Sequence, residues 1–365
     1  MLTMPPSSSY PCAVVVPSYE VVMMDTFLEQ VLLMLLGGFI GWAGTVLALP
    51  VITPKPIASL LKQLFKIPAF KPPRDWDAIE ESVSTVSNLD YGDGGMTFDI
   101  HYPVNGSLTD YPVVVWVHGG GFVGGSKEDT TGYCMCIASR GYTVVNMDYG
   151  LAPRYRHPRQ VLDVDAVLVR LGGLPASIRP DLKRGLFLAG DSAGAHIVSE
   201  YAALYSNKDY RDKLGVRLSA EVMITGCILQ CGLYDLSAFL NGSWWRHPIR
   251  FMTKQIGWAV TGNRRWHSSL QTKRMDVVEY VNSGYPPAFL MDGNYYTFDN
   301  QLACIDDRLS TLGIDHEVLS FPRSAGYPRL FHEFQFNLRK PESVFVFDRM
   351  VAFMDRLAGR DASAR

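Results

Sequence analysis

Two glycine-rich motifs, each placed directly after an apolar run, constrain the fold of this chain more than any other feature. The first is Gly190–Gly194, which reads Gly-Asp-Ser-Ala-Gly and has the form G-x-S-x-G; the second is His118–Gly121, which reads His-Gly-Gly-Gly. Apolar runs at residues 113–117 and 185–189 precede them, and a helical pattern follows the first motif. Strand, sharp turn and helix is the context in which such a serine is presented as a nucleophile. The motifs therefore predict a buried sheet with Ser192 at a strand end.

Acyl-transfer chemistry explains these residue types. A serine hydroxyl is a weak nucleophile until a base removes its proton. Fixed backbone N–H groups stabilise the charge that develops on the substrate oxygen, by about 3–4 kcal/mol per donor. We expect these donors to be the amides of Gly120, Gly121 and Ala193, because a Cβ at the two glycines would meet the acyl group. The other motif residues that we assign to the site are His118, Gly119 and Asp191.

At this point the chain resembles a known family, the hormone-sensitive-lipase-like branch of the α/β hydrolases. Four stretches carry the resemblance: His118–Gly121, Tyr149–Pro153, Gly190–Gly194 and Pro286–Leu290. It covers about residues 85–357. It implies an α/β-hydrolase fold with a serine mechanism and no metal or cofactor. The chain departs from the family at Gly150, where an arginine is usual, and at Arg154, where an acidic residue is usual.

Two later stretches, residues 297–301 and 332–336, resemble a fungal subgroup of that family. Several members of this subgroup belong to secondary-metabolite pathways. The resemblance therefore implies a lipophilic ester as substrate, for example an ester of a polyketide-type metabolite or of a sterol.

Strand-like and helical segments alternate from about residue 80 onward, which independently predicts an α/β fold with a mostly parallel, doubly wound sheet. We place this domain at residues 55–357, with a tail at 358–365. The segments at about 55–80 and 236–284 interrupt the alternation and are expected to form a helical cap. The aromatic residues of the cap either line a pocket or pack the cap onto the core.

The catalytic base is expected late in the chain, because α/β hydrolases run serine, acid, histidine in sequence order. His332 follows the last strand and precedes a terminal helix. His316 lies at the start of that strand, and His196 lies inside the helix after the nucleophile, where a structural role is expected.

The acid is harder to place. The family puts it three residues after the glycine that ends the seventh strand, and in this chain that position is Tyr296. Asp299, six residues after Gly293, is the preferred acid; it can also simply cap a helix. Asp292 is the alternative, and a biosynthetic relative could lack the acid altogether while the serine and oxyanion hole still contribute.

Residues 1–54 form an N-terminal tail that contains a long apolar run. No charged residue occurs between residues 30 and 54, and the heart of the run, residues 31–49, is long enough to cross the roughly 30 Å hydrocarbon core of a bilayer. We expect a single membrane anchor, with the endoplasmic reticulum as its location; a buried cap helix is the alternative. Lysines after the run favour a cytosolic catalytic domain, whereas sequons at Asn105 and Asn241 favour the lumen, so the orientation stays open.

Composition narrows the remaining function classes. A hydrophobic fraction of 47% suits a substantial core, and a net charge of −2 gives no overall basic field, so nucleic acid is not expected as a partner. The six cysteines form no C-x-x-C pair, which favours buried free thiols over a metal site. The expected protein is a membrane-associated serine carboxylic-ester hydrolase. The alternatives are a biosynthetic relative that performs dehydration, cyclisation or acyl transfer, and a non-catalytic binding module.

Overall fold

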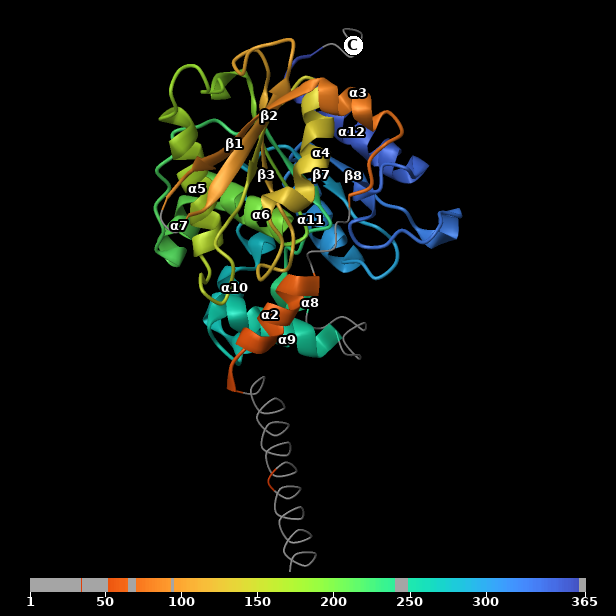
Figure 1. Cartoon of the computed structure of the whole chain (residues 1–365). Coiled ribbons are helices and arrows are strands. Elements are labelled where there is room, and N and C mark those ends of the chain that lie inside the picture. The colour runs from red at the N-terminus through yellow and green to blue at the C-terminus, as the bar shows by residue number, and fades with distance from the viewer. Residues whose placement is uncertain (1–33, 35–51, 65–69, 93–94, 240–248, 361–365) are drawn as a thin grey trace, which may run out of the picture. The chain divides into compact units, whose positions relative to one another are not determined.

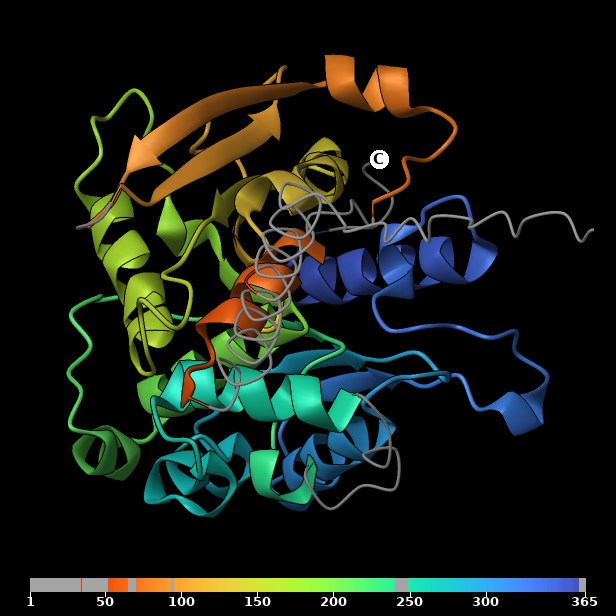
Figure 2. The ribbon, with the colours of Figure 1, turned by 60° about the horizontal axis from the view of Figure 1, so that its bottom comes forward.

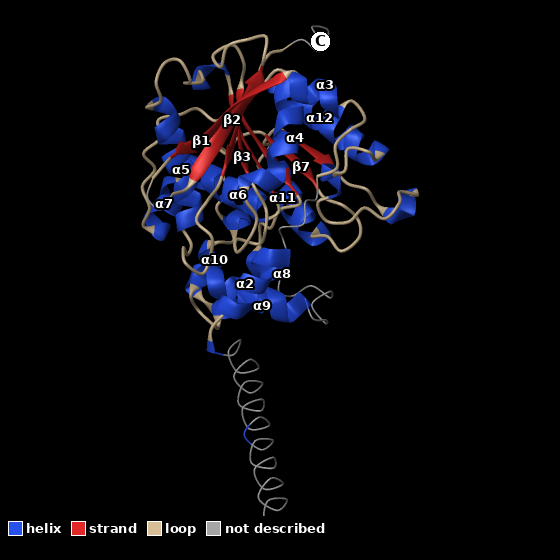
Figure 3. Ribbon diagram, in the orientation of Figure 1, coloured by secondary structure: helices blue, strands red, loops and turns tan. Residues whose placement is uncertain are grey.

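The computed structural model describes residue 34 and residues 52–64, 70–92, 95–239 and 249–360. Within these residues the chain builds one eight-stranded sheet with the order β1-β2-β4-β3-β5-β6-β7-β8 (Figure 3). The strands are β1 (Val83–Asp90), β2 (Thr97–Pro103), β3 (Val113–Val117), β4 (Thr143–Met147), β5 (Leu186–Asp191), β6 (Gly226–Gln230), β7 (Ala288–Met291) and β8 (His316–Leu319). Strand β2 runs antiparallel to both β1 and β4, and all other neighbours are parallel. The mostly parallel sheet expected from the sequence is confirmed.

Helices cover both faces of this sheet and bury the side chains of the central strands on both sides. In β3, Val113, Val115 and Val117 join one buried cluster, whereas Val114 and Trp116 join another. The first face carries α5 (Arg159–Gly172), α6 (Ala193–Ser206) and α11 (Asp299–Thr311), with α7 (Lys208–Leu214) after α6; the second carries α4 (Lys127–Ser139) and α12 (Pro341–Leu357). The fold is therefore doubly wound, and its strand ends are free to hold a site.

A group of short helices gathers at one end of the sheet, below the strands in Figure 1 and in the foreground of Figure 2. They are α2 (Lys55–Leu64), α8 (Leu236–Phe239), α9 (Ile249–Thr261) and α10 (Leu270–Arg274). Helix α2 packs against α9, and α10 packs against α8. Helix α3 (Trp76–Glu81), by contrast, packs against α4 and β1. The cap thus joins α2 to a segment almost two hundred residues later in the chain.

The predicted membrane anchor at residues 31–49 lies outside the described residues, apart from Met34. Among the helices that the structure describes, none combines the length and the apolar composition needed to cross a bilayer. The anchor and its orientation stay predictions from the sequence.

Two glycines allow α6 to start very close to the sheet. A Cβ on Gly190 would lie 2.6 Å from the carbonyl carbon of Gly194, and a Cβ on Gly194 would run into the carbonyl oxygen of Val117. Both obstacles are backbone atoms, which cannot turn aside as a flexible side chain can. The glycines at both ends of the Gly190–Gly194 motif are therefore requirements of packing.

We expect Gly194→Ala to lower the free energy of unfolding by about 3 kcal/mol, because the new methyl group displaces backbone rather than a side chain. Gly172→Ala is the matched control, since a Cβ there meets nothing within 4 Å; it should be neutral or slightly stabilising. Urea denaturation of both variants measures the effect. Equal stabilities of the two variants would contradict the close-packing argument.

Candidate active site

Ser192 occupies the sharp turn between β5 and α6. Its φ of 51° lies in the left-handed region, which costs a residue other than glycine about 1–3 kcal/mol and is typical of functional sites. Its backbone amide donates to the carbonyl oxygen of Gln230 at 2.8 Å, which ties the turn to the neighbouring strand β6. The side chain is thereby lifted from the sheet edge into a pocket.

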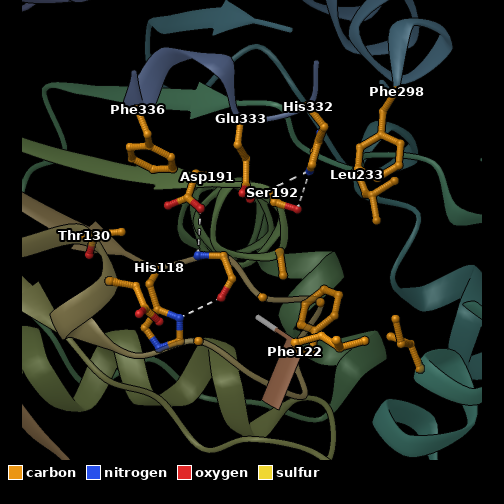
Figure 4. Close-up of a pocket in the computed structure, with 18 of the residues that line it drawn as sticks. His118, Phe122, Thr130, Asp191, Ser192, Leu233, Phe298, His332, Glu333 and Phe336 are labelled. Carbon is orange, nitrogen blue, oxygen red and sulfur yellow. Dashed lines mark hydrogen bonds and ion pairs between the residues drawn. The ribbon is translucent and has the colours of Figure 1, made fainter. Parts of the chain in front are cut away.

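His332 meets this serine from the loop between β8 and α12. The distance from His332 Nε2 to Ser192 Oγ is 2.9 Å, which allows the hydroxyl to donate to the ring (Figure 4). The other two candidate histidines lie elsewhere. His316 faces Asp306 at 3.1 Å, and the buried His196 has its Nδ1 2.7 Å from the carbonyl oxygen of Leu233. The structure thus brings the predicted nucleophile and base together.

Asp292 lies beside the base on the Nδ1 side of its ring. Its Oδ1 lies 4.0 Å from His332 Nδ1, at the end of β7. The amides of Gly293 and Phe298 donate to its two oxygens at 2.7 and 2.8 Å. Burial raises the pKa of Asp292, and the charge of His332 and the two amides oppose this rise.

The preferred acid of the sequence analysis, Asp299, is the first residue of α11, and its side chain lies outside the described part of the chain. Among the side chains that are described, the geometry supports the alternative, Asp292, and the assignment of Asp299 stays a prediction. The physical reason is the turn after β7, which folds back so that the amide of Phe298 binds the Asp292 carboxylate. Tyr296, at the usual family position of the acid, is 69% exposed and has a φ of 52°.

The predicted oxyanion loop lines the same pocket as Ser192 and Ala193. Gly120 and Gly121 both have positive φ, at 106° and 59°. A Cβ on Gly120 would run into the carbonyl oxygen of Gly124. The turn of the loop itself thus requires glycine at position 120, which adds to the expected need for space near the acyl group.

The buried carboxyl of Asp191 connects the two motifs. It accepts a hydrogen bond from the indole Nε1 of Trp116 at 3.1 Å and one from the amide of Gly119 at 2.9 Å. Burial raises the pKa of Asp191 well above its usual range, and the charge of Glu333 raises it further. Asp191 therefore holds the oxyanion loop at a fixed place relative to the nucleophile.

His118 and Tyr149, like Asp191, hold the oxyanion loop in place. The Nδ1 of His118 lies 2.7 Å from the carbonyl oxygen of Gly119, so this nitrogen carries the proton and donates. The ring stacks on Tyr149 with centroids 4.3 Å apart, and the Tyr149 hydroxyl donates to the same oxygen at 3.3 Å. The amide of Ala152 donates to Phe122 at 2.9 Å. The stretch Tyr149–Pro153, known from the sequence only as a point of resemblance, thus braces the loop.

The pocket has a volume of about 350 Å³ and receives side chains from both the cap and the sheet. Its apolar lining is contributed by Leu64 of α2, Met252 and Ile256 of α9, and Phe122, Leu233, Phe298 and Phe336. Its charged lining, among the described residues, consists of Asp129, Asp191 and Glu333 beside two histidines, with no lysine or arginine. The site therefore suits a neutral, apolar ligand better than an anion.

One described cluster has the composition of a metal site: Cys231, Asp292 and His332 bring ligand atoms within 4.8 Å of one another. A cysteine binds metal as its thiolate. Burial raises the pKa of the Cys231 thiol well above its usual range, which keeps it protonated. Because His332 also turns its Nε2 toward Ser192, we interpret these three residues as the surroundings of the base.

The site contains one residue that sequence reasoning missed. Glu333 follows the predicted base directly, lines the pocket, and has its Oε1 3.8 Å from His332 Nε2. Its position next to His332 in the chain was the available signal, but adjacency alone does not say on which side of the ring a carboxylate lies.

The neutral His118 makes stability depend on pH. Burial lowers the pKa of His118 from 6.5 to about 4. Between pH 6.5 and about 4, the unfolded chain binds a proton at His118 and the folded chain does not. The contribution of neutral His118 to the free energy of unfolding is therefore complete above pH 6.5 and is lost as the pH falls toward 4. We expect the wild type to lose about 2 kcal/mol more than His118→Asn between pH 7 and pH 5, measured by urea unfolding. Parallel pH dependence in the two proteins would show that His118 does not contribute in this way.

Comparison with known proteins agrees with this geometry. The model of the BD-FAE family matches residues 98–300. The kynurenine formamidase of Salmo salar is 31% identical over 214 residues, which are 58% of this chain and 67% of that protein. The acetyl esterase of Salmonella paratyphi B is 30% identical over 181 residues, 47% of this chain and 51% of that protein. The matched part of the chain therefore spans between half and two thirds of the length of these relatives.

Solved structures show the same fold. Esterase B from Lactobacillus rhamnosis superposes with a TM-score of 0.69 at 22% identity, covering 84% of this chain and 96% of that one. A fungal esterase from Rhizomucor miehei gives a TM-score of 0.62 at 19% identity, covering 84% and 91%. The family match and the fold together lead to one conclusion: the chain belongs to the BD-FAE family, an esterase-like family of α/β hydrolases that resembles hormone-sensitive lipase.

Proposed function

We propose that this protein is a serine carboxylic-ester hydrolase that acts on a small, neutral, lipophilic ester. The observation that carries the proposal is the 2.9 Å contact between Ser192 Oγ and His332 Nε2, next to the glycine loop. Nucleophile and base in hydrogen-bond contact are the signature of covalent catalysis by serine. A non-catalytic binding module has no use for this pair, so the contact favours an enzyme.

In the proposed mechanism, Ser192 Oγ attacks the ester carbonyl carbon while His332 Nε2 takes the hydroxyl proton. The amides of Gly120, Gly121 and Ala193 stabilise the oxyanion of the tetrahedral intermediate. The bond between the carbonyl carbon and the alcohol oxygen then breaks, and Nε2 returns its proton to that oxygen. A water molecule then attacks the acyl-enzyme, with His332 again taking and returning the proton, and the carboxylic acid is released. Asp292 stabilises the imidazolium that forms in both halves.

The lining of the pocket supports the substrate class. Aliphatic and aromatic side chains from α2, α9 and the sheet edge surround Ser192, and no lysine or arginine among the described lining residues offers a partner to an anionic substrate. A polyketide-type or sterol ester is the specific substrate suggested by the sequence resemblance. We also retain membrane attachment through residues 31–49 as part of this proposal, on the strength of the uncharged run alone.

Ser192→Ala tests the nucleophile. The variant should lose at least about 10³-fold in turnover of p-nitrophenyl acetate, because no other oxygen can form the acyl-enzyme. Wild type should also react covalently with a fluorophosphonate probe at Ser192, and Ser199→Ala, which changes a buried serine of α6, should label normally. Analysis of the products in water separates hydrolysis from dehydration, cyclisation or acyl transfer. Full turnover by Ser192→Ala would exclude the proposal.

Asp292→Asn and Asp299→Asn, compared directly, test the acid. Removing the carboxylate next to a catalytic histidine costs up to about 10⁴-fold in kcat. We expect a loss of this order for Asp292→Asn, because its carboxyl faces His332 Nδ1, and less than about threefold for Asp299→Asn. Steady-state kinetics with one ester measures both. The reverse order would restore Asp299 as the acid.

A further inference from the structure

We propose that Glu333 is a second carboxylate that serves the base, holding His332 from its Nε2 side and stabilising the imidazolium formed during catalysis. This inference rests on the proposed function, because it gives Glu333 a role in the serine mechanism. Glu333 acts through His332 and is therefore a positioning residue.

The imidazole of His332 lies between two carboxyl groups. Asp292 Oδ1 is 4.0 Å from Nδ1, and Glu333 Oε1 is 3.8 Å from Nε2. Both distances are longer than a hydrogen bond, and Nδ1 has no hydrogen-bond partner among the described residues. Neither carboxylate makes a hydrogen bond to the ring at these distances, so each acts on it through its charge.

Glu333 is held in place by its backbone and by a neighbour. Its φ of 60° is left-handed, which is uncommon for glutamate, and its carbonyl oxygen accepts from the amide of Phe336 at 3.3 Å. Its side chain lies against the carboxyl of Asp191: a Cβ built on Gly119 would sit 2.9 Å from Glu333 Oε1 and closer still to Asp191. The backbone turn thus directs the glutamate into the space between Asp191 and the catalytic pair, as Figure 4 shows.

Other ionisable groups around Glu333 are shifted toward their neutral forms. Burial, followed by the charge of Glu333, raises the pKa of Asp191 well above its usual range, which favours the protonated form of Asp191. Burial also raises the pKa of the Tyr149 phenol and of the Cys231 thiol, which keeps both neutral. His332, whose ring gains a positive charge in the proposed mechanism, faces the Glu333 carboxyl at 3.8 Å.

This arrangement predicts what the glutamate contributes. When the serine proton moves to Nε2, the ring gains a positive charge 3.8 Å from the Glu333 carboxylate. The carboxylate takes no proton itself; its attraction favours the charged ring and so raises the basicity of His332. Because Glu333 is about one quarter exposed, solvent weakens this attraction. We expect it to change the equilibrium between protonated and neutral His332 by about tenfold.

Glu333→Gln tests the inference, because it keeps the size of the side chain and removes its charge. We expect the pKa of the His332 ring to fall by about one unit, measured by NMR titration of ¹⁵N-histidine-labelled protein with His332→Gln to assign the signal. The acid limb of the kcat/KM profile should move to lower pH by a similar amount, and kcat should fall more than KM changes. Glu333→Asp should recover part of both shifts, since it restores the charge.

The exposed Glu81→Gln is the matched control and should leave the titration and the profile unchanged. An unchanged His332 titration in Glu333→Gln would overturn the inference, whatever its activity. If wild type neither hydrolyses esters nor reacts with a fluorophosphonate, the proposed function fails, and the titration still decides whether Glu333 acts on His332. In the double variant Glu333→Gln with Asp292→Asn, we expect a larger loss of kcat than in either single variant; a loss equal to that of Asp292→Asn alone would also contradict a second supporting carboxylate.

Discussion

The carboxyl of Asp191 is the interaction on which the rest of the site depends. It sits at the end of β5, one residue before the nucleophile, and binds the indole of Trp116 and the amide of Gly119. Since these partners belong to β3 and to the loop that follows it, a single buried group sets the distance between nucleophile and oxyanion loop. Burial raises the pKa of Asp191 well above its usual range, which favours the protonated form and reduces the repulsion between Asp191 and Glu333.

The sequence predicted the parts of the fold that follow from local rules. The alternation of apolar runs and helices predicted the doubly wound sheet, and the two glycine motifs placed Ser192 and its loop correctly, because strand, turn and helix each leave a local pattern. His332 followed from chain order. The acid was harder to predict, because the sequence does not show that the turn after β7 brings the amide of Phe298 back to Asp292.

Glu333 escaped prediction for a related reason. A residue beside the base in sequence can lie on either side of the ring, and its direction depends on a left-handed φ that the sequence does not display. Among the described residues, the non-glycine positions with positive φ are Asn88, Phe122, Ser192, Cys231, Tyr296 and Glu333. Phe122, Ser192 and Glu333 line the pocket, Tyr296 lies in the turn after β7, and Cys231 lies near Asp292 and His332, so backbone strain is concentrated where the chemistry is proposed.

The cap helices shape part of the substrate pocket, whereas the sheet and its loops hold the reactive groups. Leu64 of α2 and Met252 and Ile256 of α9 line the pocket, yet none of them belongs to the glycine motifs or to the turn that holds Asp292. Changes in these helices can therefore reshape the space for the substrate while the reactive groups stay fixed. In evolutionary terms, the part of the substrate pocket that the cap supplies is encoded apart from the reactive groups, so it can change while the catalyst is kept.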